Sequence, residues 1–190
     1  MKPKDDRKVE AIAAAVYRLT ARRGLAAVTL ADIGREAGIA TSTLYVYYKS
    51  REDLLDDLYQ KAKTATLLRY AQHDDPAASL KSRVRRIWEN IVANRVEHSQ
   101  QVAFLEQYYH SDFLSDASRA LGQRMAAPFL DILIAGQTSE QLKPVAPILL
   151  AATVLGLAKE TAILIAEGRL ANDEPTRASG FQICWDAIRA

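Results

Sequence analysis

The stretch from Thr29 to Leu55 constrains the fold most, because it carries start and stop signals for three successive helices. Thr29 and Asp32 have the spacing of a capping box, in which a hydroxyl and a carboxylate satisfy each other's backbone N–H groups. Gly38 can adopt the left-handed conformation that ends a helix. The pattern predicts a short helix that starts after Thr29 and stops at a tight turn.

A second short helix is expected after that turn, and a third follows it. Thr41 or Ser42 can cap the second helix, and Leu44 and Tyr48, four residues apart, lie on one face of it. Ser50 begins a second capping box, which opens a helix at Arg51. A helix, a glycine-containing turn and a helix with a polar outer face together indicate a helix-turn-helix motif.

The run Thr-Leu-Tyr-Val-Tyr-Tyr-Lys-Ser-Arg-Glu-Asp-Leu-Leu, residues 43–55, resembles the signature of the tetracycline repressor (TetR) family of bacterial transcription regulators. The resemblance covers about Val9 to Leu55. It implies an N-terminal DNA-binding domain, residues 1–52, and a helical regulatory and dimerisation domain, residues 53–190. It also implies that Tyr45 binds a phosphate and that Arg51 sits at a helix N-terminus over the DNA backbone.

Hydroxyl and cationic side chains of the motif are the candidates for contact with double-stranded DNA. Hydroxyls can bond to base edges, and a threonine methyl can touch a thymine methyl. The second helix is expected in the major groove. The candidate residues are Thr29, Thr41, Ser42, Thr43, Tyr45, Tyr47, Lys49 and Arg51. Tyr48 is read instead as a packed aromatic.

The charge distribution agrees with binding of DNA by one end of the chain. Residues 1–51 contain ten Lys and Arg against five Asp and Glu, whereas the remaining residues contain 15 against 18. A basic N-terminal part on a mildly acidic body suits phosphate contact through the N-terminal part alone.

The rest of the chain reads as helical throughout. No segment alternates like a strand, so the expected class is all-α with about nine helices. Aromatic residues are frequent among the middle helices and could line a pocket for a small-molecule effector. The candidate pocket residues are Trp88, His98, Phe104, Tyr108, Met125 and Phe129. Each of them could equally be an ordinary core residue.

The segment Ile148–Ala166 is apolar on all sides, so it must be covered on all sides. A second copy of the chain is the simplest cover, and a four-helix bundle built with Thr176–Ala190 is the expected homodimer. The candidate interface residues are Ala152, Gly156, Ile163, Phe181, Trp185 and Ile188. The alternative is that this segment is the central helix of a monomer.

Other functional classes have little support in the sequence. The single cysteine allows no internal disulfide, and the segment Val145–Ala158 is too short for a bilayer span. No apolar signal region, catalytic constellation or metal-ligand spacing is recognisable, so a cytoplasmic, non-enzymatic protein without a cofactor is expected and no membrane is needed. The alternative function is a helical small-molecule-binding or enzymatic protein whose helix-turn-helix contacts a protein partner.

Overall fold

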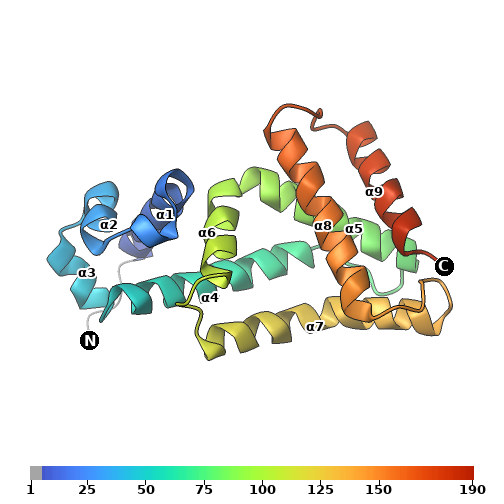
Figure 1. The fold of residues 1–190 in the computed structure, drawn as a ribbon, viewed down its shortest axis with the longest axis horizontal. Coiled ribbons are helices and arrows are strands. Elements are labelled where there is room, and N and C mark those ends of the chain that lie inside the picture. The colour runs from blue at the N-terminus through green and yellow to red at the C-terminus, as the bar shows by residue number, and fades with distance from the viewer. Residues whose placement is uncertain (1–5) are drawn as a thin grey trace. The chain divides into compact units, whose positions relative to one another are not determined.

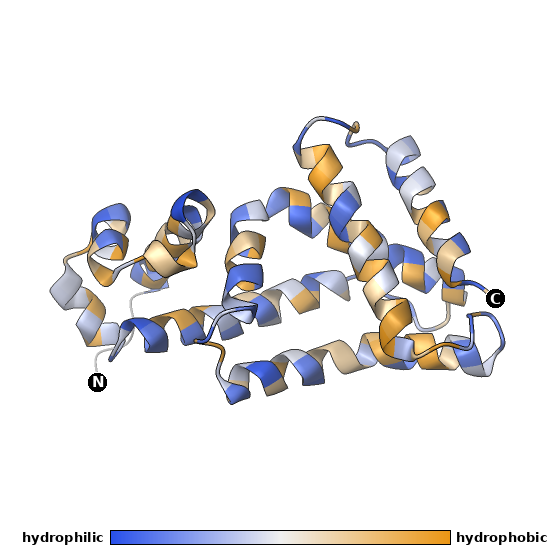
Figure 2. Ribbon diagram, in the orientation of Figure 1, coloured by the Kyte–Doolittle hydropathy of each residue, from blue (hydrophilic) through white to orange (hydrophobic). Residues whose placement is uncertain are grey.

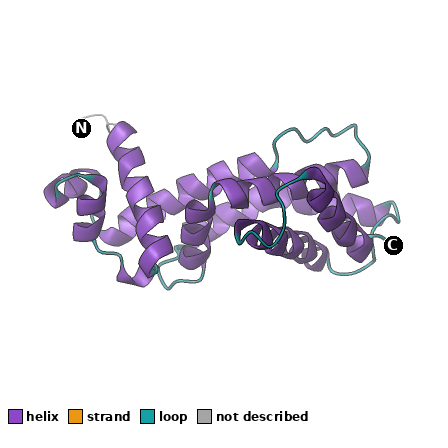
Figure 3. Cartoon of the chain, turned by 90° about the horizontal axis from the view of Figure 1, so that it is seen from above, coloured by secondary structure: helices purple, strands orange, loops and turns teal. Residues whose placement is uncertain are grey.

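The computed structural model describes residues 6–190, which form nine α-helices and one short 3₁₀-helix (Figure 1). Within this range every element is a helix or a loop (Figure 3). The all-α prediction is confirmed for these residues. The elements are α1 Asp6–Arg23, η1 Leu25–Ala27, α2 Leu30–Ala37, α3 Thr41–Tyr47, α4 Arg51–Tyr70, α5 Leu80–Glu97, α6 Ser99–Tyr109, α7 Asp116–Thr138, α8 Pro147–Ala166 and α9 Glu174–Ile188.

The chain packs as two compact units. Residues 1–64 and 99–122 belong to the first unit, and residues 65–98 and 123–190 belong to the second. Helices α4 and α7 therefore contribute to both units. The predicted boundary between residues 52 and 53 was drawn by function, and it does not coincide with the boundaries of the two compact units. As a division of function it stays a prediction.

The core of the first unit joins the helix-turn-helix to α4 and α6. Helix α1 packs against both α2 and α6. Leu44 of α3 and Leu55 of α4 are buried in the same cluster as Phe104 of α6. The helix-turn-helix is thus held by α6, a segment that lies well beyond it in the sequence.

The turn of the motif has the expected start and stop signals, with one correction. Both halves of the Thr29–Asp32 capping box are present, and Gly38 has a positive φ of 67°. A Cβ on Gly34 would lie 2.7 Å from the carbonyl oxygen of Ile39, so the turn requires glycine there too. The expected cap at Thr41 or Ser42 is wrong, because Ala40 is the N-cap of α3 and offers no side-chain hydrogen bond.

Arg51 fastens the connection between α1 and α2 to the start of α4. Its Nε donates to the carbonyl oxygen of Val28 at 2.6 Å, and its Nη2 donates to that of Leu25 at 2.8 Å. The guanidinium also lies over the ring of Phe113, 5.0 Å from its centroid, and the side chain is only 17% exposed. Two donors of the guanidinium are therefore used inside the first unit, and the expected phosphate contact of Arg51 stays a prediction.

Asp56 of α4 holds the segment that follows α6. One carboxylate oxygen, Oδ1, accepts hydrogen bonds from Tyr108 Oη (2.9 Å), Ser115 Oγ (2.9 Å) and Ser118 Oγ (2.7 Å). Desolvation by itself would raise the pKa of Asp56, but the donors, Ser118 foremost, hold it below its usual value. The ionised carboxylate of Asp56 therefore connects α4 by hydrogen bonds to α6 and to the start of α7.

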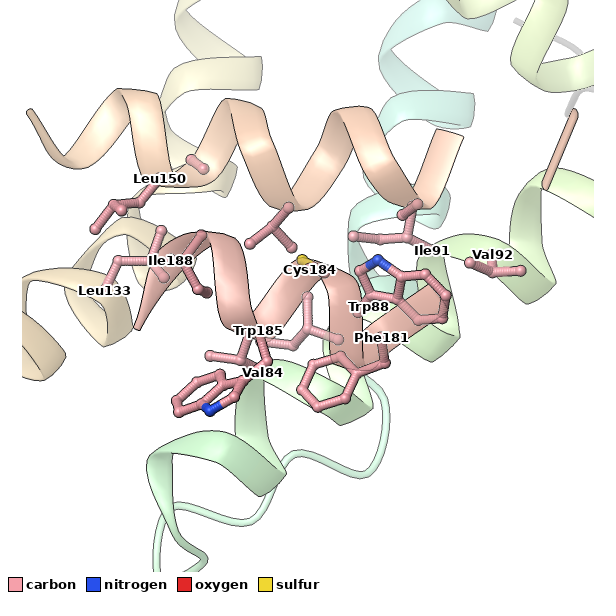
Figure 4. Packing of buried hydrophobic residues seen from close by; sticks show 14 of the residues in the cluster. Val84, Trp88, Ile91, Val92, Leu133, Leu150, Phe181, Cys184, Trp185 and Ile188 are labelled. Carbon is pink, nitrogen blue, oxygen red and sulfur yellow. The ribbon is translucent and has the colours of Figure 1, made fainter. Parts of the chain in front are cut away.

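The second unit is built on α5, α8 and α9. Helix α5 packs against both α8 and α9, and α8 packs against α9. Trp88 of α5 and Phe181 of α9 meet edge to face with their ring centroids 6.1 Å apart, and both side chains are buried (Figure 4). Cys184 lies in the same core, where burial raises the pKa of its thiol to about 12. This thiol stays protonated and acts as a small apolar side chain.

Replacing Arg51 with alanine is expected to destabilise the first unit. Loss of two charge-assisted hydrogen bonds to backbone carbonyls should lower the free energy of unfolding by about 2–3 kcal/mol. Urea denaturation monitored by circular dichroism measures this effect. The control is Arg35→Ala, which removes an exposed cation bound to Asp32. If Arg51→Ala keeps wild-type stability, the internal role of Arg51 is wrong.

Replacing Asp56 with asparagine is expected to have a pH-dependent cost. The folded-state pKa lies below the unfolded value of about 3.9, so the carboxylate stabilises the fold above that pH. Its contribution disappears as the pH falls through the folded-state pKa. The stability gap between wild type and Asp56→Asn should therefore be full at pH 7 and narrow below about pH 4. A gap that stays constant from pH 7 to pH 3 would contradict the role assigned to the carboxylate.

Candidate DNA-binding surface and effector cavity

Helix α3 has one buried face and one exposed face. Leu44 is buried in the core of the first unit, and Tyr48, just after the helix, is buried beside it. On the outer face Tyr45 is 60% exposed and Val46 is 77% exposed. The outer face of α3 therefore presents a phenol and an aliphatic side chain next to each other.

The predicted contact residues of the motif fall on or beside this outer face. Ser42, Tyr45 and Lys49 are exposed, whereas Thr41, Thr43 and Tyr47 are partly exposed. Val46 was missed by the sequence reasoning, although its position next to Tyr45 and away from Leu44 already placed it on the outer side. We define the reading face as Ser42, Thr43, Tyr45, Val46, Tyr47 and Lys49.

Tyr48 is a structural residue, as its pairing with Leu44 indicated. Its hydroxyl donates to Asp57 Oδ2 of α4 at 3.1 Å. Burial, together with the charge of Asp57, raises the pKa of Tyr48 well above its usual value. The phenol therefore remains protonated and fixes the end of α3 against α4.

Thr29, the N-cap of α2, and two arginines of α1 are bound to acidic residues of α2. The Thr29 hydroxyl donates to Asp32 Oδ2 at 2.7 Å and accepts from the backbone N–H of Asp32, so its bonding capacity is used by the cap. Arg18 and Arg22 bind Glu36 at 2.8 and 2.6 Å. These arginines, the Arg18 hydrogen bond foremost, hold the pKa of Glu36 below its usual value.

The second unit contains a cavity of about 300 Å³. Its walls come from the end of α4 and the loop after it, from α5, from α7 around Pro128, and from α8. The lining residues are Leu67, Leu68, Tyr70, Ala71, Asp74, Ile87, Ile91, Met125, Ala126, Pro128, Phe129, Ile132 and Leu155. The size is at the lower end of the range for small-molecule sites.

Two of the six predicted pocket residues, Met125 and Phe129, line this cavity. Trp88 is instead buried in the core of the second unit, and His98 is the C-cap of α5. Phe104 and Tyr108 are buried in the core of the first unit. These four therefore do not line the cavity: Trp88, Phe104 and Tyr108 fill the cores of the two units, and His98 ends a helix.

Helix α8 exposes a large apolar face. It is apolar over most of its surface (Figure 2), and by length and composition it is the one described helix that could cross a membrane. Leu149 is 57% exposed and Leu155 is 42% exposed, and Ala152 and Gly156 are exposed beside them. Ile163 is partly buried. On α9 the exposed apolar residue is Ile183, at 63%.

The interface predicted for α9 needs a correction. Phe181, Trp185 and Ile188 are at most 8% exposed, because they pack into the core of their own subunit against α5 and α8. The apolar stripe on α9 was recognised, but its periodicity does not tell which neighbour covers it. The large apolar residues that stay exposed on these two helices are therefore those of the outer α8 face and Ile183.

Two family models match the chain. One, described as "Bacterial regulatory proteins, tetR family", matches residues 11–58. The other, described as "Tetracyclin repressor-like, C-terminal domain", matches residues 53–190. Together they cover residues 11–190, which include the helix-turn-helix.

Solved structures have the same fold. A TetR family transcription regulator from Marinobacter aquaeolei aligns with a TM-score of 0.90 at 24% identity, over 100% of this chain and 99% of that one. A putative TetR family transcriptional regulator from Vibrio parahaemolyticus aligns with a TM-score of 0.81 at 22% identity, over 96% and 99% of the two chains.

A curated relative is similar in sequence over part of its length. An uncharacterized HTH-type transcriptional regulator of Haemophilus influenzae is 27% identical over 99 residues, which are 52% of this chain and 53% of the relative. The aligned part thus spans about half the length of that relative. With both family models matched in sequence, and with the helix-turn-helix exposed as described, the chain belongs to the TetR family and is a DNA-binding transcriptional regulator.

Proposed function

We propose that this regulator is a cytoplasmic homodimeric repressor, which leaves a pseudo-palindromic operator when a small apolar molecule fills the cavity of the second unit. The observation that carries the proposal is the exposed reading face of α3, with Tyr45 and Val46 in water and Leu44 anchored below. We assign residues 1–52 to DNA binding and residues 53–190 to regulation and dimerisation.

The reading face suits recognition of bases in the major groove. Hydroxyls of Ser42 and Thr43 can donate to or accept from base edges, and the Val46 methyls can pack on a thymine methyl. Lys49 and the Tyr45 hydroxyl suit phosphate oxygens, which position the helix without selecting sequence. Thr29 and Thr41 stay secondary candidates, since the Thr29 hydroxyl serves the cap of α2.

The outer α8 face suits a two-fold dimer interface. Leu149, Ala152, Leu155 and Gly156 form an exposed apolar strip, and nothing lies within 4 Å of a Cβ built on Gly156. A two-fold interface uses the same strip on both copies, so an open glycine allows close approach of the two helices. A dimer would present two copies of α3 to two half-sites, which lie about 34–36 Å apart on DNA.

Helix α4 provides a physical link between effector and operator. Its first half carries Leu54, Leu55 and Leu58 into the core that holds α3, and its last turns supply Leu67 and Leu68 to the cavity wall. Because α4 is one continuous helix, a molecule that moves its last turns can also move its first half, which supports α3. A coupling of about 1–3 kcal/mol between effector and operator is usual for such systems.

The proposed function is tested by selecting bound duplexes from a random pool with the purified protein. We expect an enriched sequence with two inverted half-sites whose centres are about one helical turn of DNA apart. An effector that fills the cavity should then lower the affinity for this duplex. Enrichment of no sequence at all would contradict a sequence-specific regulator.

Replacing Thr43 or Tyr47 with alanine should alter which sequences are selected. A lost base contact costs about 1–3 kcal/mol at one position of the site and leaves the others unchanged. Lys49→Ala should instead weaken all sequences equally and reduce the slope of log K against log salt by about 0.9 for each lost phosphate contact. Arg86→Ala on α5 serves as the control for loss of one exposed cation.

Either of two results would contradict the assignment of these residues. Uniform weakening by Thr43→Ala and Tyr47→Ala would make both residues positioning contacts only. A salt slope unchanged by Lys49→Ala would remove Lys49 from the phosphate contacts.

Replacing Leu149 with glutamate should disrupt the dimer without unfolding the subunit. The side chain is exposed within one chain, so a charge there meets water in the monomer but an apolar partner surface in the dimer. Sedimentation velocity should show monomers that bind the operator poorly, and circular dichroism should show that these monomers keep the helical content of the wild type. Leu170→Glu, also at an exposed apolar residue but outside the α8 face, is the control. A Leu149→Glu protein that remains dimeric would place the interface elsewhere.

A further inference from the structure

The walls of the cavity in the second unit are almost entirely carbon. Of its lining residues only Tyr70 and Asp74 have oxygen in their side chains, and the others are aliphatic, aromatic or thioether. A ligand in this cavity therefore exchanges water mainly for apolar surface. Any charged group of the ligand needs a partner in the lining, because an unpaired charge removed from water is strongly disfavoured.

The single charged lining residue, Asp74, is already neutralised. Arg83, at the start of α5, donates from Nε to Asp74 Oδ1 at 3.0 Å and from Nη2 to Asp74 Oδ2 at 2.7 Å. This is a two-bond, fork-like pair, the strongest geometry between these side chains. Both side chains are about one fifth exposed, so the pair is at the rim rather than in bulk water.

The pair also stabilises the charged forms of both partners. The Arg83 hydrogen bonds hold the pKa of Asp74 below its usual value, against the opposing effect of desolvation. The Asp74 hydrogen bonds correspondingly raise the pKa of Arg83. The carboxylate thus stays ionised yet presents little net charge to a molecule in the cavity.

We propose that the cavity accepts uncharged apolar molecules and that Arg83 determines this selectivity by neutralising Asp74. The inference rests on the proposed role of the cavity as the effector site. A carboxylate-bearing ligand finds no cation in the lining and faces the Asp74 oxygens. A cationic ligand finds the carboxylate already bound on both oxygens. Without Arg83, Asp74 becomes a free anion in the lining, and the affinity of the cavity for cations increases.

The test uses three probes with the same apolar chain and different head groups: decan-1-ol, decanoate and decylammonium. Binding to the full-length protein is measured by isothermal titration calorimetry at pH 7.5 and in the absence of DNA. The wild type should bind decan-1-ol at least about tenfold more tightly than either ion. The charged head group of each ion leaves water without gaining a partner in the cavity, and the loss of one hydrogen bond to a charged group corresponds to about that factor.

Two variants separate the role of Arg83 from a general effect of mutation. In Arg83→Gln, decylammonium should gain about tenfold or more in affinity, while decan-1-ol changes little. The double variant Asp74→Asn with Arg83→Gln removes both charges, and it should lose the gain for decylammonium while still binding decan-1-ol. Retained binding of decan-1-ol shows in each case that the cavity is folded.

Several results would overturn the inference. Decanoate or decylammonium binding to the wild type as tightly as decan-1-ol would exclude the proposed selectivity, and so would the absence of decan-1-ol binding. An unchanged affinity for decylammonium in Arg83→Gln would remove Arg83 from its assigned role. If decan-1-ol binds as expected but leaves operator affinity unchanged, the inference on the cavity stands and the proposed gating of DNA binding fails.

Discussion

The anchoring of α3 by Leu44 and Tyr48 is the interaction on which the DNA-binding surface depends. A helix of seven residues is too short to be stable by itself, because the cost of nucleation is not recovered in two turns. Its N-cap, Ala40, contributes no side-chain bond. Burial of Leu44 and the hydrogen bond from Tyr48 to Asp57 therefore hold the helix, and they leave its other face free for DNA.

The start of α4, which holds α3, is itself bound to other segments of the first unit. Arg51 binds the carbonyls of Leu25 and Val28, and Asp56 accepts three hydroxyl donors from α6 and the start of α7. The first unit thus includes segments on both sides of residues 65–98. Helices α4 and α7 begin in this unit, and their later turns supply residues such as Leu67 and Phe129 to the walls of the cavity.

The features set by neighbouring residues were predictable from the sequence. The Thr29 cap, the Gly38 turn and the division of α3 into a Leu44 face and a Tyr45 face need only local geometry. The partners of Arg51 are 23 and 26 residues away, and no local pattern reveals them. Likewise, helical periodicity identified the apolar stripe with Phe181 on α9 but could not tell whether the same subunit or a partner covers it.

We propose that the outer face of α3 lies in the major groove of a two-fold operator. The most direct measurement replaces Val46, which is 77% exposed, with a photo-crosslinking amino acid and maps the bases joined to it on a selected duplex. We expect crosslinks to major-groove atoms in two symmetric half-sites about one helical turn apart. Crosslinks absent from a duplex that is still bound, or found in one half-site only, would contradict it.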